Sequence, residues 1–528
     1  MIRIPKIPDI PEQERTSTVI QLLEVTYYQT ELIQNLRNQI AILKGDKPKP
    51  EIKPSGMEKN SEGRKDKKAD DGKRAGSDKR EKTGQLKIHK EVCIPPENIP
   101  EGSKFKGYKD FIVQGIIIKP NNILYRMERW ITKDGQYIEG KLPVAVNGHF
   151  DATLKSYILY QYYNCHVTQP LIHEQLHEFE IDISKGQINN ILIGKHEYFH
   201  TEKDEILSTG LEISSYINVD DTGARHQGEN GVCTHIGSEF FTWFKSTESK
   251  SRINFLELLR AGRTNYCINQ DALDYMGAQK LPKSQQELFA GEEQKVFANK
   301  YEWENHLKKL AITDKRHKRI ATEGSLIGSI LENGFNRELA IMSDDAGQFN
   351  ILLHTLCWVH AERTVHKIIP FSEDQRNALE LTRDKIWKLY DDLKDYKEEA
   401  TAEKKIDLEK RFDEIFQEKT CFITLNLALN RLYKNKAELL LVLQRPEIPL
   451  HNNGSESDIR EYVKRRKVSG GTRSSCGRQS RDTFISLKKT CRKLGLSFWE
   501  YLYDRVSGLN SISRISELMR KRQLFFST

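Results

Sequence analysis

Two apolar segments of this chain, far apart in the sequence, each end in a pair of aspartates. The first reads LEISSYINV and runs into Asp220 and Asp221; the second reads ELAIMS and runs into Asp344 and Asp345. Both have the apolar composition of buried strands. An ionised carboxylate at the end of a buried strand is costly to desolvate unless a partner or a metal ion compensates it. One such acid is more often a loop cap, but two favour a buried sheet that gathers acidic side chains at one edge.

The residues after the first acidic pair extend this interpretation. Gly223 follows in a turn, two β-rich stretches pass through VCTHIGSEFFTWF, and a helix begins near Lys250. The order strand, acid, turn, strand, strand, helix is how a ribonuclease-H-like fold begins. We therefore expect a multidomain protein with an α/β ribonuclease-H-like catalytic domain over residues 211–505.

A third candidate acid lies in the stretch HNNGSESDIREYVKRRK. Ser455 can cap a helix whose first turn holds Glu456, with Arg460 one turn on to orient it. By position alone, Glu456 could simply be an acid that complements the helix dipole. The dense positive charge that follows is typical of a nucleic-acid contact and favours the catalytic interpretation. The candidate DNA-binding residues in this basic stretch are Arg465, Arg466, Lys467 and Arg473.

A Cys and a His three residues apart follow the second acidic pair, in LCWVHAERTVHKII. Cys357 and His360 would share one face of a helix and could ligate a metal ion. Two ligands do not make a structural zinc site, and the sequence has no second pair of this kind. We therefore interpret both as residues that support an active site.

The N-terminal part of the chain carries patterns of a different kind. Mostly apolar residues at alternating three- and four-residue steps predict a coiled-coil helix over residues 14–44, with a lone amphipathic helix that packs on its own chain as the alternative. Residues 45–90 are charged, Gly-rich and almost free of aliphatic side chains, which predicts a disordered basic linker. Apolar alternations broken by turn residues predict a small β-rich domain over residues 91–150.

Helical patterning fills residues 151–205, where TQPLIHEQLHEFEIDISKGQINNILIGK divides into two short amphipathic helices around a turn. This predicts a helix-turn-helix. Ser184 is the expected cap of the second helix. On that helix Lys185, Gln187 and Asn190 suit contacts with phosphates and base edges. An ordinary helical hairpin in the core is the alternative.

The composition excludes some classes of protein. Hydrophobic residues make up 37% of the chain, and no run of about 18 apolar residues could span a bilayer. The N-terminus MIRIPKIPDIPEQERT lacks the apolar core of a secretory signal. Eight cysteines without a Cys-x-x-Cys pair indicate a reducing compartment and argue against a zinc finger. We therefore expect a cytoplasmic protein, and the net charge of +8 permits a polyanion as partner.

With these residues, the chain resembles the TnpC-type transposases of bacterial insertion-sequence family sixty-six over most of its length. The matching motifs are Asp220-Asp221-Thr222 for the family's Asp-Glu-Thr, Ser343-Asp344 at the second strand, CWVHAER, Asn452 to Glu456 for Asn-Asn-x-x-Glu, and Arg466-Lys467 after the last acid. The chain departs from the family at His451, where Asp is usual, and at Ser457, where Arg is usual. It also lacks the family's Cys-rich zinc finger. The stretch from Gln270 to Asn336 is long for the gap between the first and second acids, so we expect a diverged subgroup.

The resemblance implies a DDE-type transposase that cleaves transposon ends and transfers the strands to target DNA. Its catalytic and metal-binding residues would be Asp220, Asp344 and Glu456, with two ions of Mg²⁺ or Mn²⁺. A helical insertion is expected within the catalytic domain at about residues 370–445, and a C-terminal tail at residues 506–528.

The expected partners follow from the same resemblance. They are DNA, as transposon ends and as target, a second copy of this chain in a homo-oligomer on that DNA, and accessory transposition proteins. Two other interpretations stay open. One is a non-catalytic DNA-binding remnant of a transposase, and the other is a ribonuclease-H-like nuclease without strand transfer.

Overall fold

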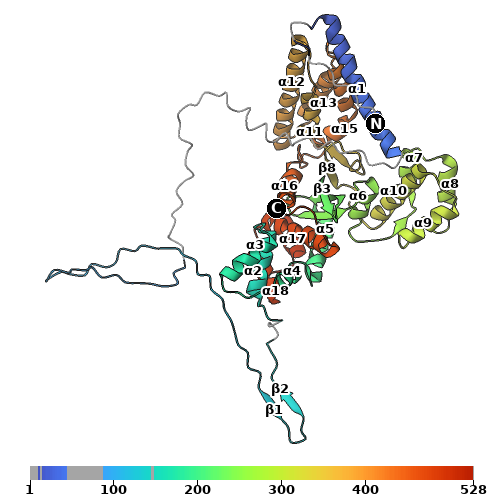
Figure 1. Ribbon diagram of the computed structural model, residues 1–528. Helices are drawn as coiled ribbons and strands as arrows, with labels where there is room; N and C mark the ends of the chain where they lie inside the picture. Colours follow the sequence, from blue (N-terminus) through green and yellow to red (C-terminus); the bar gives the residue numbers. More distant parts are fainter. Residues whose placement is uncertain (1–9, 12–14, 44–86, 144–147, 527–528) are drawn as a thin grey trace. The chain divides into compact units, whose positions relative to one another are not determined.

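A computed structural model describes residues 10–11, 15–43, 87–143 and 148–526. They divide into two units: Met1–Gln29 with Asn122–Thr528, and Thr30–Asn121. Figure 1 shows the helices and strands coloured along the chain. The predicted basic linker, residues 45–90, lies almost wholly outside the described residues and stays a prediction.

A five-stranded mixed sheet forms the core of the larger unit (Figure 1). Its strands, in their spatial order, are β5 (Thr242–Thr247), β4 (Glu229–Gly237), β3 (Tyr216–His226), β8 (Ala340–Ser343) and β9 (His354–Leu356). The strand β4 pairs antiparallel with both β5 and β3, whereas β8 pairs parallel with β3 and β9 pairs parallel with β8. The two strands that the acidic pairs marked in the sequence, β3 and β8, are therefore direct neighbours. A mixed sheet of this kind is consistent with a nuclease-like α/β core.

Burial explains why these two segments are strands. Ile217 and Val219 of β3 have no exposed surface, and all four residues of β8 are buried. A strand that is covered on both faces reads as a continuous apolar run, as expected for parallel strands in an α/β core. The two strands pair in register with Asn218 opposite Met342.

Helices from both ends of the unit cover the sheet. The helices α5 (Glu197–Ile213) and α17 (Ser475–Lys493) pack against β5, and α16 (Asn453–Ser469) packs against β3 and β4. The helix α18 (Phe498–Ser507) contacts α2 (Ala152–Tyr163), and α19 (Ile515–Phe526) contacts α5. The predicted C-terminal tail thus contains a helix that packs on the core, with Met519 fully buried.

The predicted helix, turn and helix are present. The helix α3 (Gln169–Glu178) is followed by a turn in which Glu180 has a φ of 59°, and then by α4 (Lys185–Ile193). The Ser184 hydroxyl accepts the backbone N–H of Gln187 at 3.2 Å, which is the predicted N-cap. The use of this pair in DNA contact stays a prediction.

A helical lobe separates the first acidic strand from the second. It contains α6 (Arg252–Leu259), β6 (Tyr266–Cys267), α7 (Gln270–Ala278), α8 (Lys283–Gly291), β7 (Val296–Phe297), α9 (Lys300–Lys309) and α10 (Lys315–Glu332). Its apolar side chains, such as Trp303 and Phe289, belong to the same hydrophobic core as the sheet. The lobe thus extends the hydrophobic core that is built around the sheet.

A second helical insertion lies between β9 and α16, close to the predicted residues 370–445. It follows α11 (Trp358–His366) and consists of α12 (Glu373–Glu398), α13 (Ala402–Phe416), α14 (Ile423–Lys434), α15 (Lys436–Leu439) and the 3-10 turn Leu441–Leu443. These helices share a hydrophobic core of their own, which includes Leu389 and Phe412. The charged helices that the sequence predicted therefore form a packed bundle.

The N-terminal helix α1 (Ser17–Leu43) begins within the larger unit and packs there on its own chain. Leu23 is buried, and the buried Glu24 carboxylate accepts hydrogen bonds from the Gln375 side chain at 3.3 Å and the Thr424 backbone N–H at 3.1 Å. This contact matches the alternative to a coiled coil for the first half of the helix. Leu22, one of the heptad positions, is 61% exposed, so coiled-coil pairing through that face stays a prediction.

The segment predicted as a small β-rich domain is mostly extended without strand pairing. Within residues 91–143, pairing is confined to one hairpin of β1 (Arg129–Ile131) and β2 (Tyr137–Glu139). Large apolar side chains are exposed along it, among them Phe111 at 90% and Ile117 at 86%. An isolated two-stranded hairpin is marginal and cannot bury a face, so the alternating pattern did not lead to the expected domain. No helix among the described residues is long and apolar enough to cross a membrane.

Candidate active site

Asp220 and Asp344 come together because β3 and β8 are parallel neighbours. Asp344 directly follows the end of β8, whereas Asp220 lies within β3, which continues to His226 through the predicted turn at Gly223. Two residues beyond the paired Asn218 and Met342, the strands bring Asp220 and Asp344 to the same edge of the sheet. The pKa of Asp220 is raised to about 7, first by burial and then by the negative charge of Asp344. Asp221 and Glu456 raise it further, while the backbone N–H of Asp221 lowers it.

Glu456 reaches the same edge from α16. It lies in the first turn of that helix, which packs on β3. Its carboxylate lies 3.8 Å from His360 Nε2, 3.7 Å from Arg363 Nη1 and 4.0 Å from Arg460 Nη2. Asp344 and Glu456 also both act on His360, whose pKa is nevertheless lowered because it is buried. Three acids from three elements thus converge, with the predicted His360 and Arg460 beside the third.

Hydrogen bonds from the Cys-x-x-His and Asn-Asn motifs fix this convergence. The backbone N–H of Asn452 donates to the Cys357 thiol at 3.2 Å, and the Asn452 side-chain amide donates to the carbonyl of Val219 at 2.9 Å. The backbone N–H of Trp358 donates to the Leu450 carbonyl at 2.9 Å. The start of α11, the start of α16 and the residue just before Asp220 are therefore joined directly.

The neighbouring acids are engaged elsewhere. The Asp221 carboxylate accepts hydrogen bonds from the Thr234 hydroxyl at 2.6 Å and the Gln348 amide at 3.0 Å. Successive side chains of a strand point to opposite faces, so Asp221 and Asp220 face different surroundings. Asp345 forms an ion pair with Arg431 of the second insertion. These contacts favour Asp220 and Asp344 over their neighbours as the members of the cluster.

The donor chemistry of the three acids suits a hard divalent cation. Carboxylate oxygens are the ligands that Mg²⁺ and Mn²⁺ prefer. A cation would offset the cost of burial and the mutual repulsion that together raise the pKa of Asp220. Over the described ranges, no group of three or more acidic, His or Cys side chains is placed so that it could hold a metal ion. The three acids therefore fit such an ion by residue type, and their carboxylates would have to move closer together to hold it.

The predicted DNA-binding residues occupy unlike positions. Arg465 is buried, with its guanidinium 3.6 Å from the ring centroid of Tyr162 and a hydrogen bond of 3.0 Å to the Tyr162 carbonyl. Its position is that of a core residue, which departs from the predicted phosphate contact. Arg466 is half-buried and donates to Gly223 and Thr222 beside the acidic edge. The exposed members of the predicted set are Lys467, Arg473, Lys185 and Asn190, with Gln187 partly exposed.

Two arginines that pair with acids at this edge were not singled out as site residues in the sequence, although Arg363 ends the CWVHAER motif. Arg363 lies three residues after His360, and that helical spacing could have placed it on the same face. Arg431 gave no such signal, because its partner Asp345 is far away in sequence and they meet only when the second insertion folds against the sheet.

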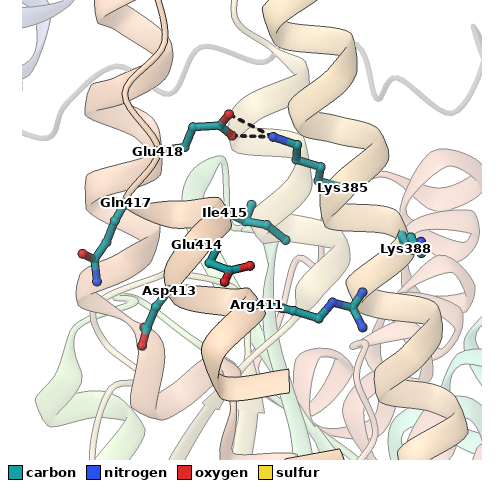
Figure 2. A pocket seen from close by; sticks show the side chains of 8 residues that line it. All are labelled: Lys385, Lys388, Arg411, Asp413, Glu414, Ile415, Gln417 and Glu418. Atoms are coloured by element: carbon teal, nitrogen blue, oxygen red, sulfur yellow. Dashed lines mark hydrogen bonds and ion pairs between the residues drawn. The ribbon is translucent and has the colours of Figure 1, made fainter. Parts of the chain in front are cut away.

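A groove among the described residues lies away from these acids. It measures about 680 Å³ and is lined by side chains of α12, α13 and the residues after α13, including Lys388, Arg411 and Glu414. Figure 2 shows that the lining side chains carry charges of both signs and that Lys385 and Glu418 pair across it. None of Asp220, Asp344 and Glu456 lines the groove, so it gives no support to the candidate site.

The central mixed sheet and the helices around it make this an α/β protein, and the sheet is consistent with a nuclease-like core. Residues 300–480 match the model of a family described as "Transposase IS66 family". The chain is also 43% identical over 303 residues to the uncharacterized protein y4jO of Sinorhizobium fredii (strain NBRC 101917 / NGR234), an alignment that covers 57% of this chain and 94% of the relative.

This chain belongs to the IS66 transposase family. The matched residues include Asp344, Cys357, His360 and Glu456, whereas Asp220 lies before them. Membership supports a transposase role and indicates a DNA-processing protein that acts on DNA. The assignment of individual catalytic residues goes beyond it.

Proposed function

We propose that this protein is a DDE transposase, which cleaves transposon ends and transfers the strands to target DNA. The proposal assigns catalysis to Asp220, Asp344 and Glu456 on a ribonuclease-H-like domain. The observation that carries it is the convergence of these acids from β3, from the end of β8 and from the first turn of α16, close enough for their charges to act on one another.

The three carboxylates would together hold two divalent ions, Mg²⁺ or Mn²⁺. Bound ions of this kind, about 4 Å apart, activate an attacking oxygen and stabilise the leaving oxygen of a phosphodiester. The role of the protein is to position the carboxylates: two parallel strands fix Asp220 and Asp344, and a helix presents Glu456. Arg363, His360 and Arg460 limit the directions in which the Glu456 carboxylate can turn.

The reaction proposed consists of two transfers of a phosphodiester. Water attacks at a transposon end, so that one P–O bond forms, another breaks and a 3′-hydroxyl is released. That hydroxyl then attacks a phosphodiester of the target DNA, again exchanging one P–O bond for another. Neither transfer needs a covalent protein intermediate. The partners proposed are transposon-end and target DNA, a second copy of the chain and accessory transposition proteins.

Substitution of single acids tests the assignment. Asp220→Ala, Asp344→Ala and Glu456→Ala are each expected to abolish cleavage and to leave the Kd for DNA within about two-fold, because the acids serve the metal ions and not the phosphates. Suitable substrates are duplexes that carry the DNA on either side of the coding sequence of this chain, with Mg²⁺ or Mn²⁺ present. Cleavage is followed on gels and binding by fluorescence anisotropy.

Asp345→Asn is the matched control, since it removes the same charge from the adjacent position and breaks only an exposed ion pair with Arg431. It should cleave at nearly the wild-type rate. Near-wild-type cleavage by any of the three Ala variants would show that the wrong acid was chosen.

A strand-transfer assay separates the proposal from its alternatives. Pre-cut ends with a free 3′-hydroxyl are mixed with a circular target plasmid, and joined products are scored. A nuclease without strand transfer would nick the plasmid and give no joined product. A non-catalytic remnant would bind the ends and give neither.

A further inference from the structure

A buried polar cluster joins the first turns of α16 to β4. His235 and Ser455 have no exposed surface and Asp458 is 3% exposed. The other members come from the start of β5 and the end of α17, and they are Thr242, Lys489 and Lys493. The reaction proposed above gives none of these residues a task.

One imidazole ring connects two positions of α16. His235 Nε2 lies 3.1 Å from the Asp458 carboxylate, and His235 Nδ1 lies 2.6 Å from the Ser455 hydroxyl. A carboxylate only accepts hydrogen bonds, so Nε2 carries the proton, and Nδ1 of the neutral ring accepts the proton of Ser455. The two residues that the ring holds lie on either side of Glu456 in the sequence.

The carboxylate that holds the ring is itself fixed. Asp458 accepts a hydrogen bond of 2.6 Å from Thr242 and contacts the ammonium groups of Lys493 at 2.8 Å and Lys489 at 2.9 Å. A buried polar network whose members are all paired is rigid. His235 is therefore anchored at Nε2 and can act on Ser455 through Nδ1.

The backbone of His235 lies opposite the first catalytic acid. In the antiparallel pairing of β3 and β4, Asp220 is in register with His235. The same residue thus contacts the strand of Asp220 through its backbone and the turn of Glu456 through its side chain. Two of the three acids are connected by one residue.

We propose that His235 is a positioning residue, which sets the separation between Asp220 and Glu456 through its hydrogen bond to Ser455. It touches neither DNA nor the reacting atoms. The role in catalysis rests on the function proposed above, whereas the mechanical link can be tested without it. A displacement of about 1 Å in a catalytic group can lower a rate on the order of 100-fold.

The test uses the full chain and two loss variants, Ser455→Ala and His235→Ala. Each should lower kcat for end cleavage about 10- to 100-fold with KM for DNA within about two-fold of wild type, since the acids are misplaced and the DNA surface is unchanged. The double variant should lose no more kcat than the single variant with the lower kcat, because both substitutions break the same link. His235→Gln, which keeps a donor and an acceptor in the side chain, should recover part of kcat.

Hydrogen–deuterium exchange of residues 452–458 supplies a readout that is independent of activity. Amides of this turn should exchange at least about ten-fold faster in both loss variants than in wild type, since local opening is easier. Ser325→Ala is the matched control: Ser325 is also fully buried and its hydroxyl donates to the Thr322 carbonyl at 3.0 Å within α10. It should alter neither kcat nor exchange in this turn.

The outcomes separate the two proposals. Unchanged exchange in the loss variants overturns the positioning role, whatever happens to kcat. Wild-type kcat in those variants also overturns it and leaves the transposase proposal intact. If the wild-type protein cleaves no DNA, the transposase proposal fails, and the exchange data alone decide whether His235 holds the turn.

Discussion

At the scale of single residues, the close approach of α16 to β3 depends on a position without a side chain. A Cβ added to Gly454 would stand 2.7 Å from Nδ2 of Asn218, a side chain that is only 7% exposed. Cβ atoms essentially never come so near to another heavy atom. The buried amide has little room to withdraw in a close-packed interior. Gly454 thereby lets the helix of Glu456 lie against the strand of Asp220.

We predict that Gly454→Ala lowers the cleavage rate on the order of 100-fold, since a shift of about 1 Å at the helix start displaces Glu456. The apparent Tm should change little. Overpacking costs roughly 1–3 kcal/mol, and Ala in place of Gly inside a helix returns about 1 kcal/mol. The measurements are single-turnover cleavage and thermal unfolding.

Gly291→Ala is the control for this substitution, because nothing lies within 4 Å of its added Cβ. It should cleave like wild type. Adding Asn218→Ala to Gly454→Ala removes the Asn218 amide with which the new Cβ clashes, and should restore part of the cleavage rate. If Gly454→Ala alone cleaves normally, the spacing of α16 and β3 does not control the site.

At the scale of elements, the local sequence pattern predicted a segment correctly where the apolar face of that segment is buried in the structure. The strands that carry Asp220 and Asp344, the capped helix after Ser184 and the insertion near residues 370–445 were all predicted from apolar spacing and capping residues. Over residues 91–143 the same pattern accompanies a single short hairpin in the described part of the chain, and large apolar side chains there are exposed. Periodicity indicates which face is apolar and says nothing of what packs on it.

Charge density was a weaker guide than apolar spacing. Arg465, Arg481 and Lys488 lie in the basic stretch that predicted a DNA contact, yet all three are buried. Arg465 packs on Tyr162 and Lys488 pairs with Glu461. Arg481 donates to the Ser469 hydroxyl at the end of α16 and to the Gly470 carbonyl that follows. A sequence cannot distinguish a cation that faces solvent from one that a distant acid or carbonyl neutralises. The hydrogen bond between His235 and Ser455 could not be predicted either, because its partners are far apart in the sequence.

The exposed residues of the same stretch give the prediction for the DNA contact. Lys467→Ala and Arg473→Ala should each weaken binding to every duplex and flatten the log–log dependence of affinity on salt by about one unit, because one phosphate contact releases one fewer counterion. Asn190→Ala on α4 should instead alter the preference between end and scrambled duplexes, with little change in salt slope. Anisotropy titrations at several salt concentrations measure both.

Arg225→Ala is the matched control for these titrations: its guanidinium donates to the Gly228 carbonyl at the tip of the β3–β4 hairpin. It should leave the salt slope unchanged. A wild-type slope in both Lys467→Ala and Arg473→Ala would mean that the exposed cations of this stretch face solvent and not DNA.

At the scale of the whole molecule, buried ion pairs join helices that precede the sheet to helices that follow it. Arg505 of α18 pairs at 3.1 Å with Glu202 of α5, and both are almost fully buried. Glu461 of α16 contacts His166, in the loop after α2, at 2.8 Å, and it pairs with the buried Lys488 of α17. Removal of one member leaves the other charge buried without compensation, which costs about 3–5 kcal/mol. In the unit that holds the candidate site, buried ion pairs therefore hold the helices before the sheet to those after it.

The Glu461 cluster predicts how stability depends on pH. The hydrogen bond from His166 and then the ammonium group of Lys488 hold the pKa of Glu461 well below its ordinary value of 4.5. A group whose folded pKa is depressed stabilises the native state in full above the unfolded pKa, and this contribution is lost as pH falls through the folded pKa. Wild-type stability should therefore decline below about pH 4.5, and Glu461→Gln should lower the apparent Tm most at pH 7 and least in acid. Thermal unfolding of both proteins between pH 7 and pH 3 measures this difference.

Glu414→Gln is the control, since it removes only an exposed ion pair at 3.8 Å from Lys410, and it should shift the Tm little at any pH. A Tm difference between wild type and Glu461→Gln that stays constant down to pH 3 would contradict the assignment, since the stabilisation would then not depend on the charge of Glu461.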